Sequence, residues 1–181
     1  ECVESIQENN YSNYEVVIVD NQITDHSAVQ LRMNQARYHY ILLEAEANDG
    51  FSSGNNIGIR YAMEQEADYV LLLNNDTLVE PDFLTELIGY QENHEECAVA
   101  IGKIYYAFDR NRIWYAGGSV SSITTRTAHY DFGKKDNHRV KEPIQVSFAT
   151  GCYVSIRKGV FEENNPLTGK VFCADCGAKM Y

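Results

Sequence analysis

The chain has 181 residues and a formal net charge of −11 at neutral pH, with 15 Lys and Arg against 26 Asp and Glu. This length is enough for one domain with a sizeable core. The acidic balance argues against a surface that binds the phosphates of nucleic acid, because such a surface needs clustered Lys and Arg. An anionic ligand would therefore need a metal ion or backbone amides.

The sequence has no pattern that directs it into or across a membrane. No apolar run approaches the roughly 20 residues that span a bilayer, and no signal-peptide pattern is present. We therefore expect no transmembrane segment and a cytoplasmic location, with a peripheral position at the inner face of the membrane left open. The five cysteines are scattered and odd in number, which predicts reduced thiols rather than a disulfide framework.

Helical and strand patterns alternate at the start of the chain. Residues 2–6 carry an apolar stripe that predicts the body of a helix. Residues 14–20, YEVVIVD, read as a buried strand that ends in an acid, Asp20. A helix is predicted over residues 27–37 and a further strand over residues 38–43.

Residues 48–56, NDGFSSGNN, are rich in Gly, Ser and Asn and are followed by apolar residues at helical spacing from Ile57. This pattern predicts a loop that opens a helix, whose N-terminal amides could face a phosphate. The loop lacks the G-x-G-x-x-G and G-K-[ST] spacings of the known phosphate-binding motifs. A capped surface loop is the alternative.

The three leucines at residues 71–73, after Asp68-Tyr69-Val70, form an unbroken apolar run that predicts a buried strand. The run stops abruptly at Asn74, Asn75 and Asp76. In open α/β sheets, ligands bind beyond the carboxyl ends of the strands. An Asp with flanking amide oxygens can offer hard oxygen ligands to a divalent cation there. These residues therefore form a candidate site.

The same stretch also fits the start of a helix. In that interpretation Asp76 or Thr77 caps a helix that has Pro81 in its first turn and an apolar stripe over residues 83–88. The residues alone do not decide between a site and a cap.

The second half of the chain mixes strands and loops. Strands are predicted over residues 97–104 and 144–157, and the polar residues 121–140 predict an exposed hairpin or mobile loop. His129 and His138 show no metal-ligand spacing and are predicted to be solvated. The alternation of strands and helices before residue 100 favours a mostly parallel sheet covered by helices.

Four segments, in this order, resemble the inverting family 2 glycosyltransferases, especially their rhamnosyltransferase-like members. The segments are EVVIVDNQITDHS, NDGFSSGNNIGIRYA, DYVLLLNNDTLVEPDFLTELI and VSFATGCYVSIRKGVF. The resemblance covers about residues 1–161 and implies a GT-A fold, an α/β architecture with a mostly parallel central sheet flanked by helices.

The resemblance also implies roles for individual residues on the donor side. Asp20 resembles the acid that contacts the base and ribose of the nucleotide. Asn48, Gly50, Phe51 and Asn55 fall in the segment that resembles the nucleotide-proximal loop and helix.

The resemblance places the metal and the acceptor at two further segments. Asn74, Asn75 and Asp76 resemble the D-x-D-type motif of the family. Asp76 is then the expected direct ligand of Mg2+ or Mn2+, Asn74 stands where a first Asp is often found, and Asn75 belongs to the nucleotide-sugar site. Thr150 and Gly151 resemble the segment that lines the acceptor side.

The implied reaction is transfer of a sugar, with rhamnose the sugar expected from the resemblance, from a dTDP-, UDP- or GDP-sugar to a saccharide acceptor in cell-surface polysaccharide synthesis. A cation would neutralise the departing nucleoside diphosphate, and a carboxylate base would deprotonate the acceptor hydroxyl. The sequence offers no candidate for that base. A catalytically impaired, nucleotide-binding remnant of such an enzyme is the alternative.

The chain departs from the family at both ends. The family's opening strand has no counterpart, so we expect an incomplete sheet whose open slot invites pairing with another molecule, such as a homodimer partner. Residues 162–181 replace the family's Glu-Asp motif and resemble the first C-x-x-C-G knuckle of the zinc ribbon in large serine recombinases, as if the reading frame had been interrupted. Cys173 and Cys176 would be half a zinc site, and we expect a weakly packed tail with free thiols instead. The acidic charge opposes a DNA-binding recombinase fragment.

Overall fold

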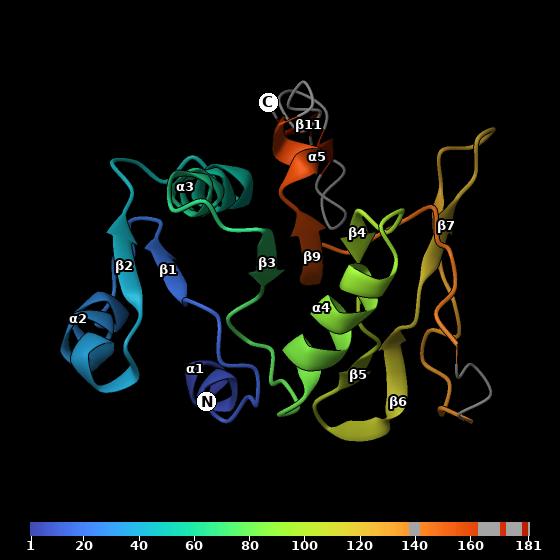
Figure 1. The fold of residues 1–181 in the computed structure, drawn as a ribbon, viewed down its shortest axis with the longest axis horizontal. Helices are drawn as coiled ribbons and strands as arrows, with labels where there is room; N and C mark the ends of the chain where they lie inside the picture. Colours follow the sequence, from blue (N-terminus) through green and yellow to red (C-terminus); the bar gives the residue numbers. More distant parts are fainter. Residues whose placement is uncertain (138–141, 163–170, 173–178, 181) are drawn as a thin grey trace.

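The structure of the protein is a computed structural model that describes residues 1–137, 142–162, 171–172 and 179–180 (Figure 1). The described helices are α1 (Cys2–Gln7), α2 (Ser27–Tyr38), α3 (Phe51–Glu64), α4 (Phe83–Asn93) and α5 (Gly159–Glu162). The strands are β1 (Val17–Asp20), β2 (Ile41–Glu44), β3 (Tyr69–Leu73), β4 (Val99–Ala100), β5 (Ile104–Tyr106), β6 (Asp109–Tyr115), β7 (Gly118–Val120), β8 (Thr127–His129), β9 (Tyr153–Arg157), β10 (Val171–Phe172) and β11 (Lys179–Met180). None of the described helices is long and apolar enough to cross a membrane.

The described strands form several small sheets, and the prediction of a mostly parallel central sheet is wrong for them. β1 and β2 pair in parallel, from Val17 opposite Ile41 to Asp20 opposite Glu44. β3 instead pairs antiparallel with β9, which also pairs antiparallel with β4. A continuous apolar run shows that a strand is buried, but it does not show which neighbour will pair with it or in which direction.

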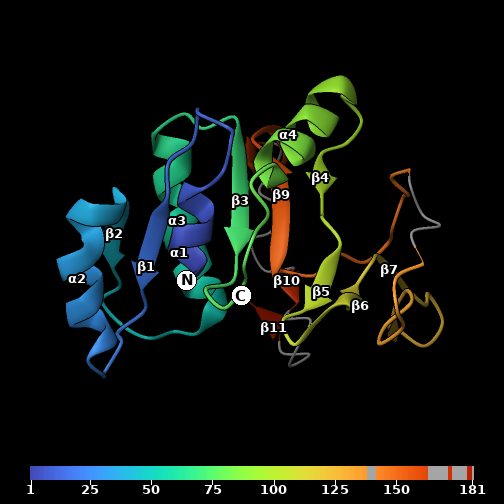
Figure 2. The ribbon, with the colours of Figure 1, turned by 90° about the horizontal axis from the view of Figure 1, so that it is seen from below.

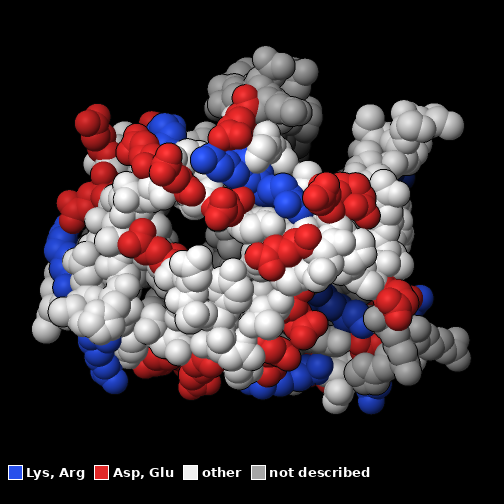
Figure 3. Space-filling model, in the orientation of Figure 1, with Lys and Arg blue, Asp and Glu red and all other residues white. Residues whose placement is uncertain are grey.

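β1 and β3 point the same way but lie in separate sheets (Figure 2). Each has its partner strand on the side away from the other, and no strand in the described part of the chain pairs with the edges between them. The space-filling view shows the molecule hollowed between these two parts (Figure 3). All residues of β1 except Asp20, and all of β3 except Val70, are only partly buried. The described strands therefore form two sheets that do not join between β1 and β3.

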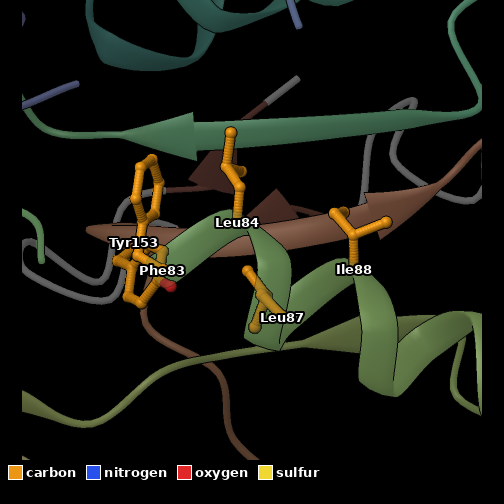
Figure 4. Packing of buried hydrophobic residues seen from close by; sticks show 5 residues of the cluster. All are labelled: Phe83, Leu84, Leu87, Ile88 and Tyr153. Carbon is orange, nitrogen blue, oxygen red and sulfur yellow. The ribbon is translucent and has the colours of Figure 1, made fainter. Parts of the chain in front are cut away.

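The main cluster of buried side chains joins α4 to β9 (Figure 4). Phe83, Leu84, Leu87 and Ile88 lie on one face of α4, as the spacing of the sequence predicts, and the ring of Tyr153 lies 6.2 Å from that of Phe83. Burying an apolar side chain of this size contributes roughly 1.5–3 kcal/mol. The cluster thus fixes α4 against the sheet of β3, β9 and β4, in which β3 ends just before Asn74.

A buried polar contact completes this packing. Gln91, which has no exposed surface, accepts a hydrogen bond through Oε1 from Ser155 Oγ at 2.6 Å. Its backbone oxygen accepts from Arg157, and its Nε2 donates to the backbone oxygen of Cys97 at 3.3 Å. These bonds hold the end of α4 against β9 and the residues before β4.

The later part of the chain forms hairpins. β5 pairs with β6 and β7 with β8, both antiparallel. Of the hairpin and the mobile loop predicted for residues 121–140, the structure has a hairpin, but its first strand, β7, lies before that range. The prediction that His129 is solvated is wrong, because its ring is half-buried among those of Trp114, Tyr115 and Phe132. His138 and most of the tail, including Cys173 and Cys176, lie outside the described residues. Within the described ranges, Cys2 and Cys97 are free thiols.

Candidate functional site

Asp20 ends β1 in a buried position, with 6% of its surface exposed. Its Oδ1 accepts a hydrogen bond from the backbone N–H of Ile23 at 2.7 Å. The carboxylate therefore closes the turn that leaves the strand, and it lies at the edge of the sheet where the sequence predicts a site.

The next residue, Asn21, ties the end of β1 to the loop that follows β2. Its Nδ2 donates to Oδ1 of Asn48 at 2.9 Å and to the backbone oxygen of Gly50 at 3.1 Å. Its own Oδ1 is buried and has no hydrogen-bond partner among the described residues. Sequence reasoning missed this role, although the position of Asn21 directly after a strand-terminal acid was the available signal.

Gly50 sets the direction in which α3 leaves this loop. Its φ of +87° lies in the region that favours glycine, and its N–H donates to Oδ1 of Asn48 at 3.2 Å. α3 begins at Phe51, six residues before the predicted start, because the Gly, Ser and Asn residues that indicated a loop are themselves helical. The first backbone amides of α3 therefore stand at the edge of the loop, as the phosphate-facing interpretation requires.

Two glycines of α3 lie close to β1. A Cβ added to Gly54 would lie 3.6 Å from Cγ of Asn21, and one added to Gly58 would lie 3.5 Å from a methyl group of Val19. Asn55, next to Gly54 on α3, is partly buried. The start of α3 is thus packed directly onto the end of β1.

The residues after β3 form a turn rather than the start of a helix. The N–H of Thr77 donates to the oxygen of Asn74 at 3.2 Å, which leaves Asn75 and Asp76 exposed at the tip. α4 begins only at Phe83, after Asp82, so neither Asp76 nor Thr77 caps it. The structure excludes the helix-cap interpretation and leaves the exposed carboxylate of Asp76 for another use.

α1 holds this turn and the residues after it by two hydrogen bonds. Oγ of Ser5 accepts from the N–H of Val79 at 3.2 Å, and Sγ of Cys2 donates to the oxygen of Asn74 at 3.7 Å. Burial raises the pKa of the Cys2 thiol above its ordinary value, which keeps it protonated as a donor. The first helix therefore fixes the position of the segment that carries Asp76.

The segment before β9 contacts both of the preceding loops. The N–H of Asn74 donates to the oxygen of Cys152 at 2.9 Å. A Cβ added to Gly151 would lie 3.7 Å from the ring of Phe51, so this ring rests against the glycine. Thr150 is buried and accepts a long hydrogen bond through Oγ1 from the N–H of Cys152 at 3.4 Å.

Three sets of contacts thus join the four segments that sequence reasoning singled out: Asn21 to the loop at Asn48 and Gly50, Phe51 to Gly151, and Cys152 to Asn74. Residues far apart in the chain meet at the ends of β1 and β3. A shallow hollow of about 350 Å³, lined by residues that include Tyr69 and Arg157, lies at the opposite end of β3 and is separate from this group.

The oxygen ligands of the turn fit a divalent cation only in part. Within the described ranges no group of three His, Cys, Asp or Glu residues is placed to hold a metal ion. Asp76 offers one exposed carboxylate, with Asn74 two residues before it. Mg2+ commonly binds through one or two carboxylates and takes its other ligands from phosphates and water. The donor set therefore fits a cation shared with a bound diphosphate and does not fit a closed protein site.

Comparison with known proteins gives a consistent result. The model of Glycosyl transferase family 2 matches residues 1–164. Glycosyltransferase GlyG of Streptococcus pneumoniae serotype 4 is 29% identical over 116 residues, which are 61% of this chain and 36% of that protein. The dTDP-rhamnosyl transferase RfbF of Shigella flexneri is 30% identical over 103 residues, 57% of this chain and 32% of RfbF. Glycosyltransferase GlyA of the same S. pneumoniae strain is 29% identical over 114 residues, 61% of this chain and 15% of GlyA. The matched regions thus span about a third or less of these relatives.

Proposed function

The chain belongs to glycosyl transferase family 2, a family of transferases with a GT-A fold, and from this premise we propose that it transfers a sugar from a nucleoside diphosphate donor to a saccharide acceptor. The observation that carries the proposal is the meeting of the loop at residues 48–51, the turn at residues 74–77 and the segment at residues 150–152. Ligands of open α/β sheets bind at such a carboxyl edge.

The donor nucleotide is assigned to the side of the site formed by β1 and α3. Asp20 and Asn48 offer acceptors to the base and ribose, and the first amides of α3, after Gly50, face the diphosphate. Asn55 and Asn75 complete this set in the proposal. The unpaired, buried Oδ1 of Asn21 supports it, because such an atom is costly unless a ligand or water completes it.

Asp76, with Asn74, would hold the Mg2+ or Mn2+ ion. When bound, the cation supplies charge neutralisation for the departing diphosphate. In this proposal a diphosphate shares the ion with the carboxylate of Asp76, which is exposed. With an amide at position 74 in place of a second carboxylate, metal affinity in the absence of nucleotide should be weak.

We propose that Thr150 and Gly151 line the acceptor side, because Gly151 lies against the ring of Phe51, the first residue of the donor-side helix. RfbF is named a dTDP-rhamnosyl transferase, and rhamnose is the sugar we propose here. The acceptor is proposed to be a cell-surface polysaccharide precursor, met in the cytoplasm at the inner face of the membrane. We also propose that residues 1–161 form the transferase domain. A further proposal is that the open strand edges between β1 and β3 pair with a second copy of the chain as a homodimer.

The alternative function is nucleotide binding without turnover. Asp20 is engaged by the N–H of Ile23, and Asp76 is assigned to the cation, so neither is a good general base. Turnover of a dTDP-sugar with an acceptor would separate the two functions.

Calorimetric titration with UDP, dTDP and GDP, each with Mn2+ and again with excess EDTA, tests the donor site. The proposal predicts metal-dependent binding of one of these nucleotides. A folded sample that binds none of them would contradict it.

A further inference from the structure

A row of aromatic rings leads from the proposed acceptor segment to the surface. Phe148, two residues before Thr150, has its ring centroid 5.5 Å from that of His129, which lies 5.8 Å from Phe132. The row continues from Phe132 to Tyr106 at 6.1 Å and from Tyr106 to Phe108 at 4.9 Å. We call Phe148, His129, Phe132, Tyr106 and Phe108 the aromatic row. Its members come from β5 and β8 and from three loops.

The inner end of the row is fixed by the core of the hairpins. Tyr115, which has no exposed surface, lies 5.2 Å from His129 and 6.3 Å from Phe148, and its hydroxyl donates to the backbone oxygen of Phe148. Gly118 leaves no room for a Cβ, which would lie 2.7 Å from the ring of Phe148. The position of the row relative to Thr150 is therefore set by packing.

The outer end is exposed to solvent. Phe108 is 80% exposed and Phe132 is 54% exposed, although both rings contact Tyr106. Exposed large rings that adjoin one another mark a binding surface more often than single exposed apolar residues do. Such rings present flat faces on which an apolar surface can stack.

Charged groups lie beside these rings. Arg112 contacts Asp109 at 3.4 Å and donates to the backbone oxygen of Gly133 at 2.6 Å. Lys134 pairs with Asp131 at 2.8 Å, next to Phe132. A surface that combines flat rings with hydrogen-bonding side chains suits a sugar ring, whose C–H face is apolar and whose edge carries hydroxyl groups.

We propose that the aromatic row binds the saccharide chain of the acceptor beyond the sugar that reacts, which rests on the proposed function. Figure 2 places β5 and β6 on the side of the molecule toward which β3 points, the side that carries Asn74. The row is continuous with the acceptor segment through Phe148. A saccharide fits better than an apolar protein partner, since only Phe108 and Phe132 of the row are exposed and they adjoin charged residues, which does not make one broad apolar patch.

The test is binding of short oligosaccharides built from rhamnose, galactose, glucose or N-acetylglucosamine. Trp114, the one tryptophan of the chain, lies 5.8 Å from His129 and can report binding by its fluorescence. The test variant is Phe108→Ala combined with Phe132→Ala, and the control is Ile123→Ala, an aliphatic side chain 92% exposed and outside the row. Because all three side chains are exposed, we expect folded variants.

The proposal predicts that at least one oligosaccharide binds, with an affinity roughly tenfold weaker in the double variant and unchanged in the control. Nucleotide binding should be the same in all three proteins. Equal saccharide affinity in the double variant overturns the proposal, and so does a wild-type protein that binds nucleotide but no saccharide of the panel. Saccharide binding without nucleotide binding would instead overturn the proposed transferase function.

Discussion

Replacing Asn21 by Ala removes the two hydrogen bonds that hold the loop after β2 against the end of β1, at 2.9 Å and 3.1 Å. Each bond of this kind contributes about 0.5–1.5 kcal/mol, so the pair contributes about 1–3 kcal/mol. Because the bonds are exposed to solvent, we expect the lower half of this range. For a chain of this size, each kcal/mol lowers the melting temperature by roughly 2–4 °C.

The assay is denaturant unfolding of the wild type, Asn21→Ala and Asn13→Ala, the last being an exposed Asn in the loop before β1. Asn48→Ala and the double variant close a cycle that measures the coupling of Asn21 to its partner. We expect the Asn21 variant to lose stability, the Asn13 control to lose none, and the two site substitutions to be less than additive. Equal stabilities of Asn21→Ala and Asn13→Ala would refute the reasoning, as would full additivity in the cycle.

Four further predictions rest on close approaches, burial and charge. Gly54→Ala should raise the free energy of unfolding by about 1 kcal/mol, because the new methyl meets only ordinary contacts and Ala favours helix. Gly102→Ala should lower the free energy of unfolding by roughly 1–3 kcal/mol, because its Cβ would lie 2.1 Å from the ring of Tyr153. Burial raises the pKa values of Tyr115 and Tyr153 to about 12, above the value of about 10 in the unfolded chain. The stabilisation that arises from this pKa difference is therefore complete below pH 10 and is lost as the pH rises through 12. Denaturant unfolding at rising pH would show this loss. A free energy of unfolding that stays constant over this window would contradict the prediction. Asp76→Asn should weaken nucleotide binding in Mn2+ to the level seen with EDTA, whereas retained metal dependence in calorimetry would remove Asp76 from the cation site.

Much of the first half of the chain could be predicted because its signals are local. The run VVIVD ends in an acid at the end of β1, and LLL followed by NND marks the end of β3. The stripe of apolar residues from Phe83 to Ile88 faces the core as its spacing indicates. Each of these depends on the period of one helix or strand, which the sequence displays directly.

The features that could not be predicted depend on contacts between distant segments. α3 begins early, although Gly, Ser and Asn have weak helix propensity, after a loop that Asn21 holds by hydrogen bonds to Asn48 and Gly50. The antiparallel pairing of β3 joins it to β9, which lies about eighty residues further along the chain. His129 stands among polar residues in the sequence but packs between rings supplied by β6 and by a later loop.

The most direct test of the central claim is to map the amide NMR shifts of the wild-type protein on addition of dTDP and Mg2+, with UDP and GDP as alternatives. If the loops after β1, β2 and β3 form a nucleotide site, the amides of Asn21, Asn48, Gly50 and Asp76 should shift together, and EDTA should reduce the effect. Shifts confined to the hollow near Tyr69 and Arg157, or no shift with any of the nucleotides, would contradict the account.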